Sequence, residues 1–376
     1  MTDSDLERRK FIKAASAAGL VGVAGCTGGP QDDGTATETG EGGTEGADAG
    51  ATAEASASIN VGMVYALGGL GDNSFNDSAK RGIEQAAGEF DVSFDESQPS
   101  SASDFQQFQQ RYARSENPNY DLVNCIGFAQ RDALASTAPD YPEQNFTLID
   151  SVVDEPNVAS YTFKEEEGSF LVGALAGLMT SRSFSAGDGS TQSDSTNVGF
   201  VGGVDAPLIR KFQAGYEAGV KHVNENVDVI TSFVGSFSDP SGGKEAALSM
   251  YQSGADIVYH AAGATGAGVF QAAQSEGRFA IGVDSDQSIT QPEFANVILA
   301  SMVKRVDSAV FKTTKNVVKG NHQGGSAVSL GLEQDGVAIV YGDTLGDDIP
   351  AEVKTEIDAS AKAIIEGEID VPTKPQ

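Results

Sequence analysis

The chain has 376 residues, more than one hydrophobic core usually supports, so two domains or lobes are expected. Its 54 acidic residues against 24 basic ones give a formal net charge of −30, spread along the chain rather than gathered in one tail. Such a surface repels phosphate backbones and anionic lipid headgroups, which argues against nucleic-acid binding and against membrane binding through basic patches. We interpret the acidity as an adaptation to high salt and not as a sign of function.

The first 26 residues resemble an export signal. The pair Arg8-Arg9 precedes an apolar stretch, residues 14–25, that is too short to cross a bilayer. The stretch ends in VAGC, which resembles the lipobox of exported lipoproteins, although an ordinary helix with an incidental cysteine is the alternative. We expect a twin-arginine lipoprotein signal over residues 1–26, with Cys26 as the lipid attachment site. The protein would then be exported and anchored to the outer face of the cell membrane by its N-terminal lipid.

Residues 27–58 consist mostly of Gly, Thr, Ala, Glu and Ser, with no aromatic or branched aliphatic side chain. Such a segment cannot bury enough apolar surface to order itself. It is therefore predicted to be a disordered acidic tether, with the folded part beginning near Ile59.

From Ile59 onward, apolar runs of strand length alternate with helical patterns. In the first half, the expected strands are residues 59–66, 121–126, 145–150 and 158–162. Apolar residues at helical spacing predict helices over residues 75–90, with Ser74 as the N-cap, and over residues 165–179. Cys125 lies in one of the apolar runs and is expected to be a small buried hydrophobe.

The second half repeats this pattern after a Ser/Gly/Asp-rich break at residues 181–196. Its expected strands are residues 198–201, 228–234, 257–260 and 279–283, and its expected helices are residues 207–223, 243–253 and 267–276. Strands that alternate with helices of this length predict parallel sheets. The fold class is therefore α/β, with two doubly wound parallel-sheet lobes and a central cleft. We assign residues 59–180 plus about 302–335 to the first lobe, and residues 197–300 plus about 336–371 to the second.

The loops that follow the expected strands combine glycine with Asp, Asn, Ser or an aromatic residue. In open parallel sheets, ligands bind beyond the carboxyl ends of the strands, where these loops meet. The loop GDNSFN places Phe75 among polar side chains directly after the first strand. An aromatic residue in that position either packs on its own helix or contacts a ligand.

Several ordered motifs between about residues 59 and 367 carry a family resemblance. They are GDNSFN, SYTFKEEEGSFLVGALAGL, VGFVGGVDAPLIRKFQAGYEAGVK, SFSDPSGGKEAALSMYQSGADIVYHAAGATGAGVFQAA, IGVDSDQ and ASMVKRVD. Together they resemble the basic membrane protein family of lipid-anchored ABC-importer substrate-binding proteins, whose characterised members bind purine nucleosides. The resemblance implies a type I periplasmic-binding-protein fold that closes on its ligand, and a membrane permease as partner. It implies no enzyme activity, cofactor, metal or nucleic acid.

The resemblance also implies roles for individual residues. Phe75 and Phe212 match the two phenylalanines that hold the purine ring, and Asp72 matches the carboxylate that bonds the edge of the base. Asn76 is expected beside the ring. Phe128, which follows the strand at 121–126, is our own candidate for the cleft wall, with a place in the core as the alternative.

The remaining implied contacts concern the ribose and a glycine turn. Asp284 and Lys304 match the residues that contact the ribose hydroxyls, and Gly263 and Gly266 match the turn before the helix at 267–276. A carboxylate can accept hydrogen bonds from two adjacent hydroxyls, so such a site would discriminate against a sugar lacking one of them.

Each candidate side chain also has a structural alternative. Phe75 and Phe212 could pack in the core, and Asp72 could cap the helix that follows it. Asp284 could be a solvated residue at a strand end, and Lys304 could pair with a surface carboxylate.

Other functions have weaker support in the sequence. The run SGGKEA lacks the first glycine and the hydroxyl residue of a phosphate-binding loop. The run GATGAG, with Asp284 at a later strand end, favours an exported dinucleotide-dependent oxidoreductase as one alternative. The other alternative is the same fold binding another small polar ligand, such as a sugar, for uptake or signalling. The three histidines are scattered and lack metal-ligand spacing.

Overall fold

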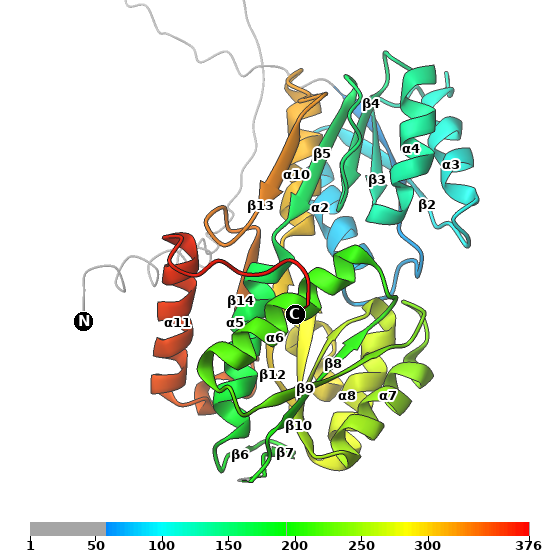
Figure 1. Ribbon diagram of the computed structural model, residues 1–376. Coiled ribbons are helices and arrows are strands. Elements are labelled where there is room, and N and C mark those ends of the chain that lie inside the picture. Colours follow the sequence, from blue (N-terminus) through cyan, green and yellow to red (C-terminus); the bar gives the residue numbers. More distant parts are fainter. Residues whose placement is uncertain (1–57, 193, 376) are drawn as a thin grey trace, which may run out of the picture. The chain divides into compact units, whose positions relative to one another are not determined.

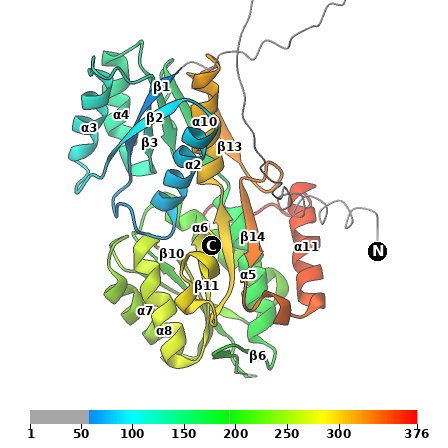
Figure 2. The same ribbon diagram turned by 180° about the vertical axis from the view of Figure 1, so that it is seen from behind.

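The computed structural model describes residues 58–192 and 194–375, and these form two parallel-stranded sheets with helices on both faces (Figures 1 and 2). The expected export signal with Cys26, and the expected tether up to residue 57, lie outside the described residues. The predicted α/β fold with two doubly wound lobes is confirmed.

The first sheet has six strands in the order β13-β5-β4-β3-β1-β2, and all neighbouring strands are parallel. Its strands are β1 (Ile59–Val64), β2 (Val92–Ser97), β3 (Leu122–Ile126), β4 (Asn145–Ile149), β5 (Val158–Phe163) and β13 (Ala327–Leu330). Every residue of β3 is buried, as expected for a central strand covered on both faces. Cys125 is a free, buried thiol in this strand, as predicted.

Five helical segments and a returning helix surround the first sheet. They are α2 (Phe75–Glu89), α3 (Asp104–Ala113), η1 (Phe128–Gln130), α4 (Arg131–Thr137), η2 (Ala138–Asp140) and α10 (Val306–Val318). Helix α10 comes from much later in the sequence and packs closely on α2, because Gly82 has no side chain to separate it from the backbone of Asp307.

The second sheet has the order β14-β12-β11-β10-β8-β9, and only the β12–β14 pair is antiparallel. Its strands are β8 (Asn197–Gly202), β9 (Asp228–Phe233), β10 (Ala255–Ala261), β11 (Phe279–Asp284), β12 (Ile298–Lys304) and β14 (Val337–Tyr341). In both sheets, the first strand of the lobe lies between the second and the third. The strand order therefore reverses at the same point, which is where open α/β sheets bind ligands.

The helical segments associated with the second sheet include two long helices that pack against each other. They are α5 (Glu165–Thr180), α6 (Pro207–Val223), α7 (Pro240–Gln252), η3 (Gly263–Thr265), α8 (Gly266–Glu276), α9 (Gln287–Thr290), η4 (Pro292–Phe294), η5 (Gly346–Asp348) and α11 (Ala351–Ile365). The break after α5 contains a small antiparallel ribbon, β6 (Ser185–Ala186) and β7 (Gly189–Ser190).

The boundary between the lobes differs from the expected one at α5. The sequence pattern predicts this helix in the first lobe, but it packs on α6 and on strands of the second sheet. Gly173 and Gly215 bring the two helices so close that a Cβ at either position would overlap a backbone carbonyl of the other helix. The chain therefore enters the second lobe at Lys164 rather than after residue 180. It returns at Arg305, because β12 continues to Lys304 in the second sheet, and it crosses a third time between β13 and β14.

Candidate functional site

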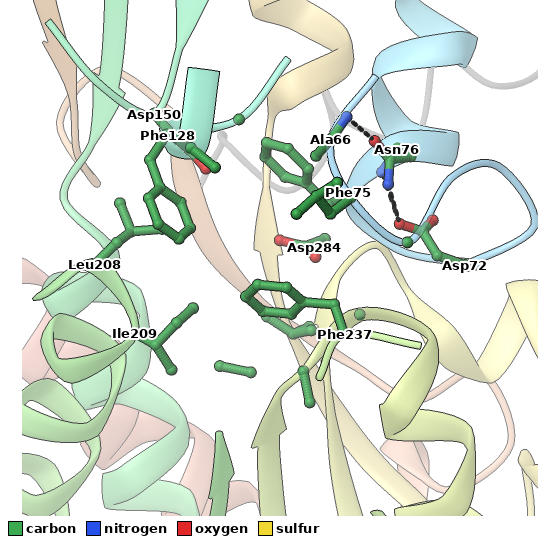
Figure 3. A pocket seen from close by; sticks show the side chains of 18 of the residues that line it. Ala66, Asp72, Phe75, Asn76, Phe128, Asp150, Leu208, Ile209, Phe237 and Asp284 are labelled. Carbon is green, nitrogen blue, oxygen red and sulfur yellow. Dashed lines mark hydrogen bonds between the residues drawn. The ribbon is translucent and has the colours of Figure 1, made fainter. Parts of the chain in front are cut away.

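A pocket lies between the two sheets, at the carboxyl ends of their strands (Figure 3). Its cavity volume is about 90 Å³, and the empty space is about 710 Å³ when the open mouth of the pocket is included. Eight of the nine residues expected in the ligand site line it: Asp72, Phe75, Asn76, Phe128, Phe212, Gly263, Asp284 and Lys304.

Four phenylalanines line the pocket, two from each lobe. Phe75 begins α2 and Phe128 follows β3, while Phe212 lies on α6 and Phe237 follows β9. Figure 3 shows the rings of Phe75, Phe128 and Phe237 pointing toward one space, with Asp284 between them. Sequence reasoning missed Phe237, although its loop GSFSDP has the same pattern as GDNSFN, an aromatic residue among polar ones after a strand.

Lys304 lies at the centre of a buried ionic cluster. Its Nζ is 2.6 Å from Oδ1 of Asp150 and 3.0 Å from Oε1 of Glu165, and the Lys304 side chain is only 1 % exposed. Glu165 is also bonded to Lys211, whose Nζ lies 2.7 Å from Oε2. The surface-pairing alternative for Lys304 is therefore wrong. Sequence reasoning did not single out Asp150 or Glu165; the only available signal was their position, at a strand end and at a helix start.

The cluster keeps Lys304 charged despite its burial. Burial alone would lower its pKa, but the carboxylates of Asp150, Glu165 and Asp284 raise it above the ordinary lysine value. Burial also raises the pKa of Asp150 to about 6, against the lowering effect of Lys304. For Glu165, the two ammonium groups of Lys304 and Lys211 outweigh burial and lower the pKa.

The same ammonium group also lies over aromatic rings. Nζ of Lys304 is 5.0 Å from the ring centroids of Phe75 and Phe163, and 5.6 Å from that of Phe212. A cation at this distance is attracted by the negative face of the ring. The arrangement joins Phe75 of one lobe and Phe212 of the other around one fixed charge.

Asp284, which ends β11, is buried and has a left-handed backbone conformation with φ of +65°. Its carboxylate accepts a hydrogen bond from Oγ of Ser74, a residue of the other lobe. Burial raises its pKa to about 7, although Lys304 acts in the opposite direction. The solvated alternative for Asp284 is therefore wrong. Asp150, which directly follows β4, has a similar φ of +72°, so a non-glycine residue adopts this strained conformation in both lobes.

Asp72 caps helix α2, as one of the two alternatives anticipated. Its carboxylate accepts hydrogen bonds from the backbone amides of Ser74, Asn76 and Asp77, and from the side-chain amide of Asn76. Asn76 in turn accepts a bond from the amide of Ala66. Four donors occupy the Asp72 carboxylate, so these two side chains organise the loop that carries Phe75 (Figure 3).

The expected N-cap position of α2 at Ser74 is confirmed, but Ser74 does not cap the helix with its side chain. Its hydroxyl is directed to Asp284 of the second lobe instead. A short polar side chain before a helix can bond either to the helix backbone or to a tertiary partner. Here the backbone amides of Asn76 and Asp77 already donate to Asp72, so the hydroxyl of Ser74 bonds to the other lobe.

The two glycines of the expected turn have different surroundings. Gly263 lines the pocket and has a φ of +57°, a conformation that favours glycine. Gly266 is not among the lining residues, because its Cα faces the ring of His260, and a Cβ there would lie 2.0 Å from Cε1. Gly268 is similarly covered by the backbone of Pro240. Two glycines of the GATGAG run therefore serve helix packing, which does not support the dinucleotide alternative.

A family model for ABC transporter substrate-binding proteins of the Bmp, PnrA-like type matches residues 59–374. This match spans nearly all the described residues and includes both lobes. The chain belongs to this family. The family resemblance seen in the sequence is therefore confirmed.

Curated relatives and a solved structure agree with this assignment. The Bmp-family chain is 34 % identical over 341 residues to the CD4+ T-cell-stimulating antigen of Listeria monocytogenes, covering 86 % of this chain and 90 % of that protein. It is 32 % identical over 335 residues to the ABC transporter nucleoside-binding protein BmpA of Lactococcus lactis, covering 84 % and 90 %. An ABC transporter solute-binding protein from Aeropyrum pernix has 30 % identity and a TM-score of 0.75, covering 85 % of this chain and 94 % of its own.

Membership of this family implies a small-molecule ligand and a membrane permease as partner for the Bmp-family chain. The family consists of substrate-binding proteins and not of enzymes. Within residues 58–192 and 194–375, no helix is both long and apolar enough to cross a membrane.

Proposed function

We propose that this protein is the lipid-anchored, extracellular receptor of an ABC importer and binds a purine nucleoside between its two lobes. The observation that carries the proposal is the pocket lining, in which phenylalanines from both lobes surround a group of buried carboxylates. A purine has two flat, weakly hydrated faces and a ribose has hydroxyl donors, and this lining offers partners for both.

The aromatic part of the pocket accounts for affinity. Stacking on an aromatic side chain contributes about 1 to 3 kcal/mol per base. Phe75 and Phe212, which come from different lobes and share Lys304, are the residues that we assign to the two faces of the base. Contacts on both faces require both lobes, so ligand binding would favour the closed form.

The polar part of the pocket accounts for selectivity. We assign the ribose hydroxyls to Asp284 and Lys304, with Asp150 and Glu165 holding Lys304 in place. The carboxylates around Lys304 disfavour a ligand that carries a phosphate, because like charges repel strongly in a buried site. A nucleoside is therefore preferred over a nucleotide.

A ligand panel tests this function. We expect inosine, guanosine or adenosine to raise the melting temperature in proportion to the logarithm of its concentration above the dissociation constant. The matched controls are free purine bases, ribose, glucose and the corresponding 5′-monophosphates. Stabilisation by a sugar, with no response to any nucleoside, would favour the alternative of a sugar-binding protein for uptake or signalling.

The lipid anchor requires a separate experiment. Cys26 lies in the lipobox-like VAGC. We expect a Cys26→Ser variant to be released from the membrane fraction into the medium, while the unmodified chain stays with the membrane. Recovery of both in the membrane fraction would contradict anchoring through this residue.

A further inference from the structure

A short segment of the second lobe, residues 284–290, is hydrogen-bonded to the start of α2 in the first lobe. Nε2 of Gln287 and Oγ1 of Thr290 both donate to the backbone carbonyl of Asn73, each at 3.2 Å. Nη2 of Arg81 donates to Oγ of Ser285 at 2.6 Å. None of these bonds involves the three chain crossings, so they join the lobes without a covalent link.

Gln287 is held in place for this contact by its own lobe. Its Oε1 accepts hydrogen bonds from the backbone amide of Val283 at 2.8 Å and from Nε2 of His260 at 2.9 Å. Since an amide oxygen only accepts, Nε2 of His260 carries the proton. Gln287 and His260 are fully buried. The amide group of Gln287 is therefore fixed, with its nitrogen directed at the first lobe.

The acceptor on the first lobe is also preset. Asn73 has a left-handed backbone with φ of +50°, and the amide bonds that Asp77 and Asp72 accept hold the surrounding loop. A non-glycine residue keeps such a conformation only where its surroundings impose it. The carbonyl oxygen of Asn73 therefore accepts hydrogen bonds from both Gln287 and Thr290, one for each of its lone pairs.

We propose that residues 284–290 are a closure latch, in which Gln287, Thr290 and Ser285 hold the first lobe in the ligand-bound position. This inference rests on the proposed function, because the latch closes the cleft around the nucleoside. Asp284 belongs to both the pocket and the latch, because it lines the pocket and also accepts a hydrogen bond from the hydroxyl of Ser74 in the opposite lobe. The latch residues other than Asp284 do not line the pocket, so they act on affinity by positioning the lobes.

The latch predicts a particular kinetic signature. In the open cleft, the same polar groups bond to water, so losing one inter-lobe bond changes the closed state much more than the encounter with ligand. We expect Thr290→Val and Arg81→Met each to raise the nucleoside dissociation rate about 3- to 10-fold. The association rate should stay within about twofold, since affinity changes among related complexes arise mostly in dissociation.

Lys80→Met is the matched control for Arg81→Met. Lys80 is the adjacent residue on α2, and among the described residues it pairs only within its own lobe, with Glu84 and Glu96. The Lys80→Met substitution should leave the association and dissociation rates of the nucleoside unchanged. Stopped-flow measurement of the tryptophan-free protein by its tyrosine fluorescence, or by a competing ligand, gives both rates. An unchanged nucleoside dissociation rate in both Thr290→Val and Arg81→Met would overturn the proposal. It would also be overturned if Lys80→Met raised the dissociation rate as much as Arg81→Met does.

A second measurement separates this inference from the proposed function. If the unmodified protein binds no nucleoside, the proposed function fails, and the latch is tested in ligand-free protein by small-angle X-ray scattering. The Thr290→Val, Arg81→Met double variant should then have a larger radius of gyration than the unmodified chain and a melting temperature close to it. Identical scattering from the two proteins would overturn the latch.

Discussion

Nζ of Lys304, at the end of strand β12, lies 2.6 Å from Oδ1 of Asp150, which directly follows strand β4 of the other sheet. This ion pair is almost fully buried and joins the two lobes beside two of the chain crossings, at Lys164 and Arg305. A buried pair of this kind is costly to form and much more costly to break on one side only. The proposed ligand site and the ionic connection between the lobes therefore share Asp150 and Lys304.

Lys304→Met should destabilise the protein strongly. It removes the cation, which leaves the buried carboxylate of Asp150 without this partner and that of Glu165 paired with Lys211. We expect a loss of roughly 3 to 5 kcal/mol in the free energy of unfolding, measured with urea at pH 7.5. In the same background, Asp150→Asn should restore part of the loss. Strictly additive effects of the two substitutions would contradict a direct interaction.

Phe75→Ala should weaken nucleoside binding about tenfold or more, the loss expected for one stacked ring. Its effect on the melting temperature should be small, because Phe75 is only partly buried at the pocket. Phe90→Ala is the control, since Phe90 follows α2 and packs on Phe311 away from the pocket lining. It should lower the melting temperature and leave affinity unchanged. The reverse pattern, measured by calorimetric titration, would make Phe75 a packing residue.

Phe237→Ala should also weaken binding, by a factor of three or more. Phe237 is partly buried, and the loop that carries it lies against Gly68 and Gly263 at the pocket. Removing the ring takes apolar surface out of the pocket lining and so reduces the apolar area that a ligand can bury. The titration used for Phe75→Ala checks this result. Equal affinities for Phe237→Ala and the unmodified protein would limit the aromatic contacts to the other rings.

Nucleoside affinity should depend on pH through Asp284. Its pKa of about 7 in the ligand-free protein means that the carboxylate is about one-tenth ionised at pH 6 and nine-tenths at pH 8. If only the ionised form accepts the ribose hydroxyls, affinity rises about tenfold between these values. Titrations across pH 5.5 to 8.5 measure this change. Asp284→Asn should remove the pH dependence as well as most of the affinity for ribosides.

Asp284 should also make stability depend on pH, and in the opposite direction to affinity: stability falls as pH rises. Because the folded-state pKa of Asp284 is raised, the folded ligand-free protein holds a proton that the unfolded chain has lost between about pH 4 and 7. Its contribution to stability is thus lost as pH rises through this window. At pH 8, Asp284→Asn is expected to melt at a higher temperature than the unmodified protein. A lower melting temperature would show that the ionised carboxylate is stabilising.

The two glycines of the turn before α8 provide a further contrast. Gly266→Ala places a methyl group against the ring of His260 and should cost roughly 1 to 3 kcal/mol of stability. Gly263→Ala strains a left-handed backbone at the pocket, which should cost about 1 to 2 kcal/mol and also weaken binding. Thermal unfolding and ligand titration of both variants separate the effects. A normal melting temperature for Gly266→Ala would contradict the packing role.

Much of the fold follows from local sequence patterns. The central strands β3, β4, β10 and β11 are short apolar runs, and α5 and α6 have long helical patterns. The edge strands were harder to predict: β2 reads VSFDES and β13 reads AVSL, with half or more of their residues partly exposed. A strand that buries only one face or lies at an edge has a weak apolar signal, so its place is decided by its neighbours.

The sequence by itself determined the alternation of strands and helices, the family motifs, and the presence of Phe75, Phe212, Asp284 and Lys304 in strand-end loops or elements. These features are local, because burial periodicity and loop composition are visible over a few residues.

Only the tertiary structure decided which partner each polar side chain takes. Ser74 turned out to bond to Asp284, Asp72 to cap α2, and α5 to join the second lobe. Residues such as Asp150 and Lys304 are 154 positions apart, and their pairing depends on how two separately formed sheets meet. The separation of two residues along the chain does not indicate their distance in the fold. The buried ionic cluster and the proposed latch therefore could not be predicted from the sequence.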